Sequence, residues 1–172
     1  MLNRLLQFSN SIFYWWLVFG FTLAGIAIAL FYQYELNQEP CVLCIHIRIW
    51  FFAILLVATI ALTLPRQRVL NIVMHTLNTT VIIGLFWKCR ELLGVERGTI
   101  ESSCMINAGL PKWFDLERWL PTLFEVRGLC GQSPDMMLGI SMAEALYVSS
   151  LLASIIGGLM ILAATYSLTR KT

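Results

Sequence analysis

Residues 41–64 read CVLCIHIRIWFFAILLVATIALTL, a C-x-x-C motif that leads directly into a run of apolar residues. A helix rises about 1.5 Å per residue and the hydrocarbon core of a bilayer is about 30 Å thick, so about twenty apolar residues can cross it. The run from Ile45 to Leu64 has this length, and Pro65 ends it. The stretch therefore predicts a membrane-spanning helix with two cysteines at its start.

The whole chain has the same apolar character. Of its 172 residues, 58% are hydrophobic and only 13% are charged, which is too apolar for a soluble domain of this size. The net charge of +2, without a basic cluster, gives no ground for nucleic-acid binding. We expect an all-α membrane protein, a four-transmembrane-helix bundle that forms a single domain over residues 1–172. The predicted spans are 12–31, 45–64, 69–87 and 146–166.

The short connections between the spans predict the orientation. Loop 32–44 carries Glu35 and Glu39 and no basic residue. Short basic segments remain on the cytoplasmic side, so we expect both termini inside and loops 32–44 and 88–145 outside. The basic residues that share the predicted inner side are Arg4, Arg66, Arg68, Arg170 and Lys171.

The five cysteines are Cys41, Cys44, Cys89, Cys104 and Cys130, and an oxidising exterior would allow them to form disulfides. The simplest pairing is local, Cys41 with Cys44 and Cys104 with Cys130, which leaves Cys89 single. As a structural staple, the second pair would contribute about 3–4 kcal/mol for a loop of roughly 27 residues. The first pair closes too short a loop to gain much, so redox chemistry explains it better.

A cysteine at the start of a helix is close to free backbone N–H groups and to the positive end of the helix dipole. These favour a thiolate, which we expect at Cys44. Arg48 follows one turn later on the same face, about 6 Å deeper in the membrane. An arginine inside a membrane is interpreted as functional by default, here by stabilising an anion on sulfur or on an acceptor. The alternative is that Arg48 extends to the lipid headgroups.

The cysteine spacing is close to that of two kinds of metal site. The two cysteine pairs could form a Cys₄ zinc site, but an oxidising exterior opposes it and the second pair lacks the short C-x-x-C spacing. Cys41-Val-Leu-Cys44-Ile-His46 is one residue longer than the haem-attachment motif C-x-x-C-H. We therefore predict no metal site.

The pattern resembles the DsbB/DsbI family of bacterial inner-membrane disulfide bond formation proteins. The resemblance covers nearly the whole chain. It rests on the span order, Pro40-Cys41-Val42-Leu43-Cys44, Arg48, and the loop pair Cys104 and Cys130. It extends to the segments LPKWFDLERWLP (110–121) and LGISM (138–142). The chain departs from the family at Ile47, Ala145 and Glu91, where a polar residue, a tryptophan and, in some members, a histidine are usual.

The resemblance implies a quinone-dependent oxidoreductase that reoxidises a DsbA-like periplasmic protein with a thioredoxin fold. Cys104 would form the mixed disulfide with this partner, and electrons would pass from Cys104/Cys130 to Cys41/Cys44. Cys44 would engage ubiquinone or menaquinone, with Arg48 beside it. The implied location is the bacterial inner membrane, with the active cysteines on the periplasmic side.

Two other interpretations remain open at this stage. An enzyme similar to vitamin K epoxide reductase runs similar chemistry, but there the quinone-side C-x-x-C lies in a late span. A non-catalytic scaffold would use its disulfides only to brace the outer loops. The sequence does not assign roles to Cys89, His46 or Glu91.

Several segments carry structural expectations. Residues 112–124, bounded by Pro111 and Pro121, predict a short helix on the outer leaflet. This helix would hold the Cys104/Cys130 loop near Cys41 or, alternatively, serve only as an aromatic anchor. Polar residues of the third span recur at helical spacing and should face the bundle interior; they are Asn71, His75 and Asn78.

Small residues of the fourth span predict close helix packing. They are Ser150, Ala153, Ser154, Gly157 and Gly158.

Overall fold

The structure, a computed structural model, describes residues 7–65, 67–100, 109–111, 115–128 and 139–169. These residues form helices and connections, and none of them forms a β-strand. Four helices are long and apolar enough to cross a membrane. They are α2 (Ile12–Tyr34), α3 (Val42–Thr63), α4 (Arg68–Glu96) and α7 (Met142–Thr169). The all-α, four-span fold class is confirmed.

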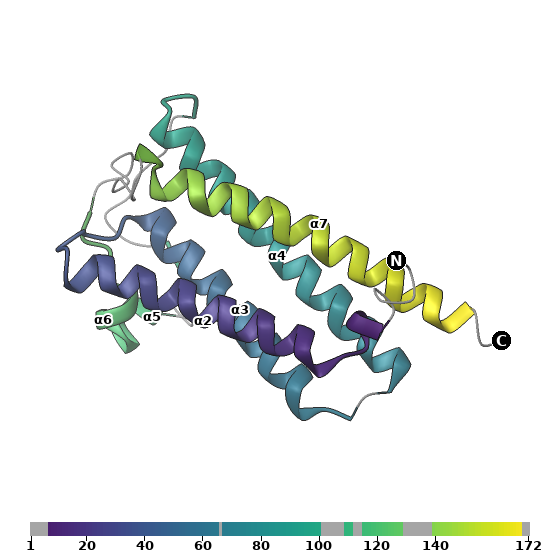
Figure 1. Cartoon of the computed structure of the whole chain (residues 1–172). Helices are drawn as coiled ribbons and strands as arrows, with labels where there is room; N and C mark the ends of the chain where they lie inside the picture. The colour runs from purple at the N-terminus through teal and green to yellow at the C-terminus, as the bar shows by residue number, and fades with distance from the viewer. Residues whose placement is uncertain (1–6, 66, 101–108, 112–114, 129–138, 170–172) are drawn as a thin grey trace.

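The four long helices pack in series, α2 against α3, α3 against α4, and α4 against α7 (Figure 1). Of the four long helices, α3, which packs between α2 and α4, is the most buried. In α3, 44% of the most apolar stretch is buried, compared with 22% in α2 and 17% in α7. The C-x-x-C motif thus begins the central helix of the bundle.

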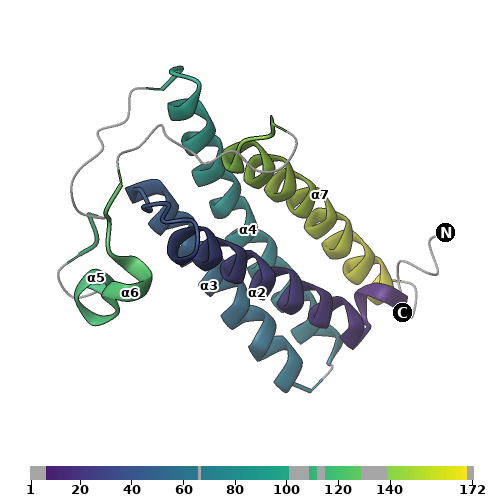
Figure 2. The same ribbon diagram turned by 60° about the vertical axis from the view of Figure 1, so that its left-hand side comes forward.

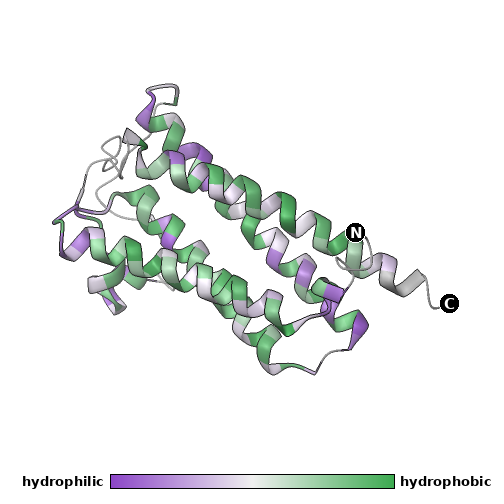
Figure 3. Cartoon of the chain, in the orientation of Figure 1, coloured by the Kyte–Doolittle hydropathy of each residue, from purple (hydrophilic) through white to green (hydrophobic). Residues whose placement is uncertain are grey.

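The surface of the bundle is suited to lipid. Phe21 on α2, Leu56 on α3 and Leu162 on α7 are 64%, 62% and 67% exposed. Exposed apolar side chains on this scale are stable where lipid, and not water, surrounds the helices. Hydrophilic residues gather towards the two ends of the bundle, as Figure 3 shows.

The helices extend beyond the apolar spans predicted from the sequence. The largest extension is in α4, which continues to Glu96, nine residues beyond the predicted end of the span at Trp87. Residues 88–96 carry four charged side chains, so hydropathy alone does not include them. They remain helical because Leu92 and Leu93 pack into the core. The helix ends just before Gly98, whose φ of 66° allows the chain to reverse direction there.

The two ends of the bundle carry different elements (Figure 2). One end carries the α2–α3 connection and two one-turn helices, α5 (Leu116–Trp119) and α6 (Pro121–Phe124). The other carries the start of α2, the α3–α4 connection and the end of α7. There His75 and Asn78 are 1% and 0% exposed, which confirms that the polar side of the third span faces inward.

His75 ties the start of the chain to α4. Its Nε2 lies 2.9 Å from the carbonyl oxygen of Ser9, and the Trp15 ring stacks on the imidazole. Asn71 donates to the same carbonyl at 3.0 Å. Because this cluster is at the end of the bundle opposite the cysteines, we assign it a structural role.

Gly157 lets α7 approach α4 closely. A Cβ there would lie 2.6 Å from Oγ1 of Thr79, a buried side chain held by its hydrogen bond to the His75 carbonyl. We predict that Gly157→Ala lowers the free energy of unfolding by about 1–3 kcal/mol, because the stiff threonine has no space to move. Thermal unfolding in detergent measures this.

The neighbouring Gly158 offers the matched control, because a Cβ there meets nothing within 4 Å. Gly158→Ala should unfold like the wild type. Equal destabilisation by both substitutions would contradict the proposed contact.

Candidate active site

Cys41 and Cys44 form a dithiol at the first turn of α3. Cys41 is the N-cap residue, and its sulfur accepts the Cys44 backbone N–H at 3.3 Å. The two sulfurs lie 2.7 Å apart as free thiols. Pro40 precedes the cap, where its missing N–H costs no helical hydrogen bond. The C-x-x-C spacing thus places both sulfurs at one helix terminus.

The surroundings at the start of α3 lower the pKa of Cys41. The hydrogen bond from the Cys44 thiol lowers the Cys41 pKa to about 7, against the opposing effect of burial, and backbone N–H groups add to the lowering. The sequence led us to expect the thiolate at Cys44. The structure instead directs the free N–H of the first turn to Cys41, because the cap is one turn earlier than expected.

Arg48 lies inside the protein. It is 5% exposed, and its NH1 donates to Oε1 of Gln33 at 2.8 Å and to the carbonyl oxygen of Leu123 at 2.6 Å. Its Nε is buried without a hydrogen-bond partner. This burial does not fit an arginine that extends to the headgroups. An unsatisfied buried N–H is costly, so the site favours a ligand that supplies an acceptor.

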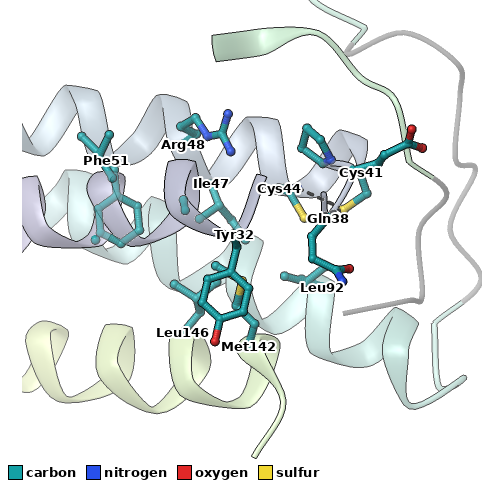
Figure 4. Close-up of a pocket in the computed structure, with 15 residues that line it drawn as sticks. Tyr32, Gln38, Cys41, Cys44, Ile47, Arg48, Phe51, Leu92, Met142 and Leu146 are labelled. Carbon is teal, nitrogen blue, oxygen red and sulfur yellow. Dashed lines mark hydrogen bonds between the residues drawn. The ribbon is translucent and has the colours of Figure 1, made fainter. Parts of the chain in front are cut away.

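The dithiol and the arginine line one cavity of about 80 Å³. Figure 4 shows the two sulfurs facing each other beside Gln38, with Tyr32 and Arg48 further along the bundle. All four long helices contribute to its walls, α4 through Leu92 and α7 through residues that include Leu146. The cavity therefore depends on the tertiary structure and not on the C-x-x-C helix alone.

A larger apolar groove adjoins this cavity. It has a volume of about 560 Å³ and is lined on one side by α2 and on another by α7. Phe51 and Leu146 line both the cavity and the groove. The two spaces are therefore neighbours, a small cavity with a dithiol and a cation beside a larger apolar groove.

The two short helices dock on the end of α3 that carries the dithiol. Phe124 of α6 is 4% exposed and packs against Ile45, which is fully buried. The predicted helix over 112–124 is broken at Leu120, because the residue before a proline disfavours helical geometry. Trp119 and Leu120 are 59% and 48% exposed, which suits contact with the membrane surface.

The segment after α6 lies against the turn before Cys41. The backbone N–H groups of Arg127 and Gly128 both donate to the Pro40 carbonyl oxygen, each at 3.1 Å. Only glycine fits at position 128, because a Cβ would overlap the Glu39 carbonyl. This contact places residues 127 and 128 of the long loop against the turn that precedes the dithiol.

The remaining cysteines and Glu91 were also singled out from the sequence. Cys104 and Cys130 lie outside the described residues. Cys89 is fully buried among apolar side chains on α4. Glu91 pairs with Lys88 at 2.8 Å. Within the described ranges, no group of three or more His, Cys, Asp or Glu side chains could hold a metal.

Sequence reasoning missed Gln33, the partner of Arg48. The signal was weak, since a glutamine in the last turn of a span is usually a residue of the membrane boundary. Leu123 acts through its backbone oxygen, for which the residue type carries no signal.

We predict that Cys41 titrates near pH 7. With Cys89, Cys104 and Cys130 replaced by alanine, its alkylation by iodoacetamide should accelerate as pH rises through about 7, because only the thiolate reacts. Cys44→Ala removes the main stabilising hydrogen bond and should move the midpoint to higher pH. A midpoint that stays near 7 without Cys44 would contradict this origin of the shift. Mass spectrometry gives the rates.

Comparison with known proteins identifies the family. Residues 11–162 match the sequence model described as "Disulfide bond formation protein DsbB". The chain is 31% identical over 172 residues to Disulfide bond formation protein B of Haemophilus influenzae, covering 99% of this chain and 97% of that protein. It is 29% identical over 167 residues to the protein of the same name from Shewanella frigidimarina, covering 96% and 99%.

Disulfide bond formation protein B 2 of Pseudomonas aeruginosa is 30% identical over 152 residues, covering 86% of this chain and 85% of that protein. The family match begins just before α2 and ends within α7. The chain therefore belongs to the DsbB family, as a multi-pass membrane oxidoreductase of disulfide bond formation.

Proposed function

We propose that this protein oxidises a periplasmic DsbA-like dithiol protein and passes the electrons to a membrane quinone. The observation that carries the proposal is the shared cavity, where a dithiol and a buried arginine with an unsatisfied N–H adjoin an apolar groove. A scaffold with structural disulfides would not need this arrangement.

The route has two thiol–disulfide exchanges. The reduced partner attacks the Cys104–Cys130 disulfide, with Cys104 forming the mixed disulfide, and leaves as an oxidised protein. The Cys104/Cys130 dithiol then reduces the Cys41–Cys44 disulfide. Each exchange moves two electrons and two protons and leaves the number of disulfides unchanged. The contact of Arg127 and Gly128 with Pro40 supports this order, because it brings the long loop to the second pair.

A bound quinone, either ubiquinone or menaquinone, would be the final acceptor of the two electrons and two protons. The residues of the cavity fit such a ring. Cys44 presents a sulfur to the cavity, and Arg48 offers a buried cation and an unsatisfied N–H for an oxygen that gains negative charge. The groove that shares Phe51 and Leu146 offers an apolar surface for the tail.

The proposed location is the bacterial inner membrane, with the dithiol end in the periplasm. The start of α2, the α3–α4 connection and the end of α7 lie at the same end of the bundle (Figure 1). Arg68 begins α4 at this end, whereas the α2–α3 connection at the opposite end carries Glu35 and Glu39 and no basic residue. This difference supports a cytoplasmic assignment of the end that carries Arg68.

The direct test mixes the purified protein with a reduced thioredoxin-fold dithiol protein and a soluble quinone, and follows quinone absorbance. The wild type should reduce the quinone as the partner is oxidised. Cys44→Ala should abolish quinone reduction while the protein remains inserted and folded, because no second sulfur remains to complete the disulfide. Full activity in this variant would refute the assignment.

Cys104→Ala tests the partner step separately. This variant should no longer yield a mixed disulfide with the dithiol partner, as judged by non-reducing gels after acid quenching. Cys89→Ala is the control and should trap the complex normally, because the Cys89 thiol is fully buried. Normal trapping without Cys104 would count against the proposed route.

Arg48→Gln tests the acceptor side. We expect the quinone KM to rise about 10–100-fold, the loss for one hydrogen bond to a charged group, while the KM for the dithiol partner stays unchanged. Arg97→Gln is the matched control, since Arg97 pairs with Glu144 at 2.9 Å outside the cavity. An unchanged quinone KM in Arg48→Gln would remove the arginine from the site.

A further inference from the structure

Gln33 connects three elements at the outer end of the bundle. Its Oε1 accepts from NH1 of Arg48 on α3 at 2.8 Å, and its Nε2 donates to the carbonyl oxygen of Thr122 in α6 at 3.3 Å. The amide orientation is determined by its partners, because arginine can only donate and a carbonyl oxygen can only accept. One side chain of α2 therefore holds both the arginine and the short helix.

The short helix also contacts Arg48 directly. The Leu123 carbonyl oxygen accepts from the same NH1 at 2.6 Å, so this nitrogen is held between Gln33 and the backbone of α6. Nε of Arg48 is buried without a hydrogen-bond partner. The guanidinium is therefore held through NH1, by the Gln33 amide and the Leu123 carbonyl oxygen.

Both groups that hold NH1 are neutral. In the described residues Arg48 forms no ion pair. A carboxylate in place of the amide would offset the positive charge, whereas an amide oxygen orients the guanidinium and leaves its charge available to an acceptor. An arginine side chain has many rotamers, so an acceptor that selects one of them lowers the entropy lost on ligand binding.

We propose that Gln33 is a positioning residue, whose neutral amide orients Arg48 in the cavity and links it to α6 without neutralising it. The inference rests on the proposed quinone site. It adds a residue that contacts neither sulfur but acts through the guanidinium.

Tyr34 provides a matched control. Its hydroxyl donates to the same Thr122 carbonyl oxygen at 2.6 Å, so it also anchors α6 to α2. Unlike Gln33, it has no hydrogen bond to Arg48 among those found at this site. Tyr34→Phe therefore removes an anchor of the short helix and retains both neutral partners of NH1.

The experiment measures the KM for a soluble quinone and the KM for the reduced dithiol partner in Gln33→Leu, Tyr34→Phe and the wild type. We expect Gln33→Leu to raise the quinone KM about tenfold and leave the partner KM unchanged. Tyr34→Phe should retain the wild-type quinone KM. A wild-type quinone KM in Gln33→Leu, or an equal rise in Tyr34→Phe, would overturn the inference by reducing Gln33 to an anchor of α6.

Two further variants make the test specific to Arg48. In an Arg48→Gln background, Gln33→Leu should cause no additional rise, because the two residues act as one unit; an additive rise would overturn the inference. Gln33→Glu keeps the length and the acceptor, which guards against misfolding of the leucine variant. It should also raise the quinone KM, since a carboxylate offsets the guanidinium charge, and a wild-type value would overturn the role of neutrality.

The outcomes also separate the inference from the proposed function. A wild-type protein that reduces no quinone would overturn both. A wild type that reduces quinone, together with unaffected Gln33 variants, would overturn only the role of Gln33.

Discussion

A buried positive charge, with no counter-charge among the residues that the structure describes, is the constraint around which the dithiol end of this bundle is organised. Taking a guanidinium out of water is costly, and the cost is partly offset when its N–H groups find acceptors. Here the acceptors are the Gln33 amide and the Leu123 carbonyl oxygen, both neutral. The charge of Arg48 is thereby retained at the cavity that also contains the dithiol.

The second constraint is the boundary between two solvents. In the proposed route, the Cys41/Cys44 pair exchanges with the Cys104/Cys130 pair on the aqueous side, whereas the quinone arrives through lipid. The start of α3 meets both needs, because its first turn carries Cys41 and Cys44 and its second turn carries Arg48 within the apolar bundle. The groove beside α2 and α7 adds an apolar surface on the lipid side.

The long loop forms part of the site. Phe124 packs on Ile45, the backbone of α6 accepts from Arg48, and the following segment donates two hydrogen bonds to Pro40. A single short segment thus contacts the arginine at one end and the dithiol turn at the other.

Much of the architecture was predictable from residue order alone. Apolar runs of membrane-spanning length predicted the four long helices, and the spacing of Cys41, Cys44 and Arg48 placed them on one helix terminus, because periodicity and hydropathy are local properties. The extension of α4 to Glu96 was not predictable in this way, since packing of Leu92 and Leu93 maintains a helix after hydropathy falls.

Only the tertiary structure decided what surrounds those residues. The pairing of Arg48 with Gln33 and Leu123 joins residues 15 and 75 positions apart, and no local pattern encodes such contacts. The same holds for the cavity, to which four helices contribute, and for the cap that assigns the free N–H to Cys41 and not to Cys44. The sequence alone determined the helices and the reactive residue types, whereas the folded chain determined their partners, because burial and hydrogen bonding depend on segments distant in sequence.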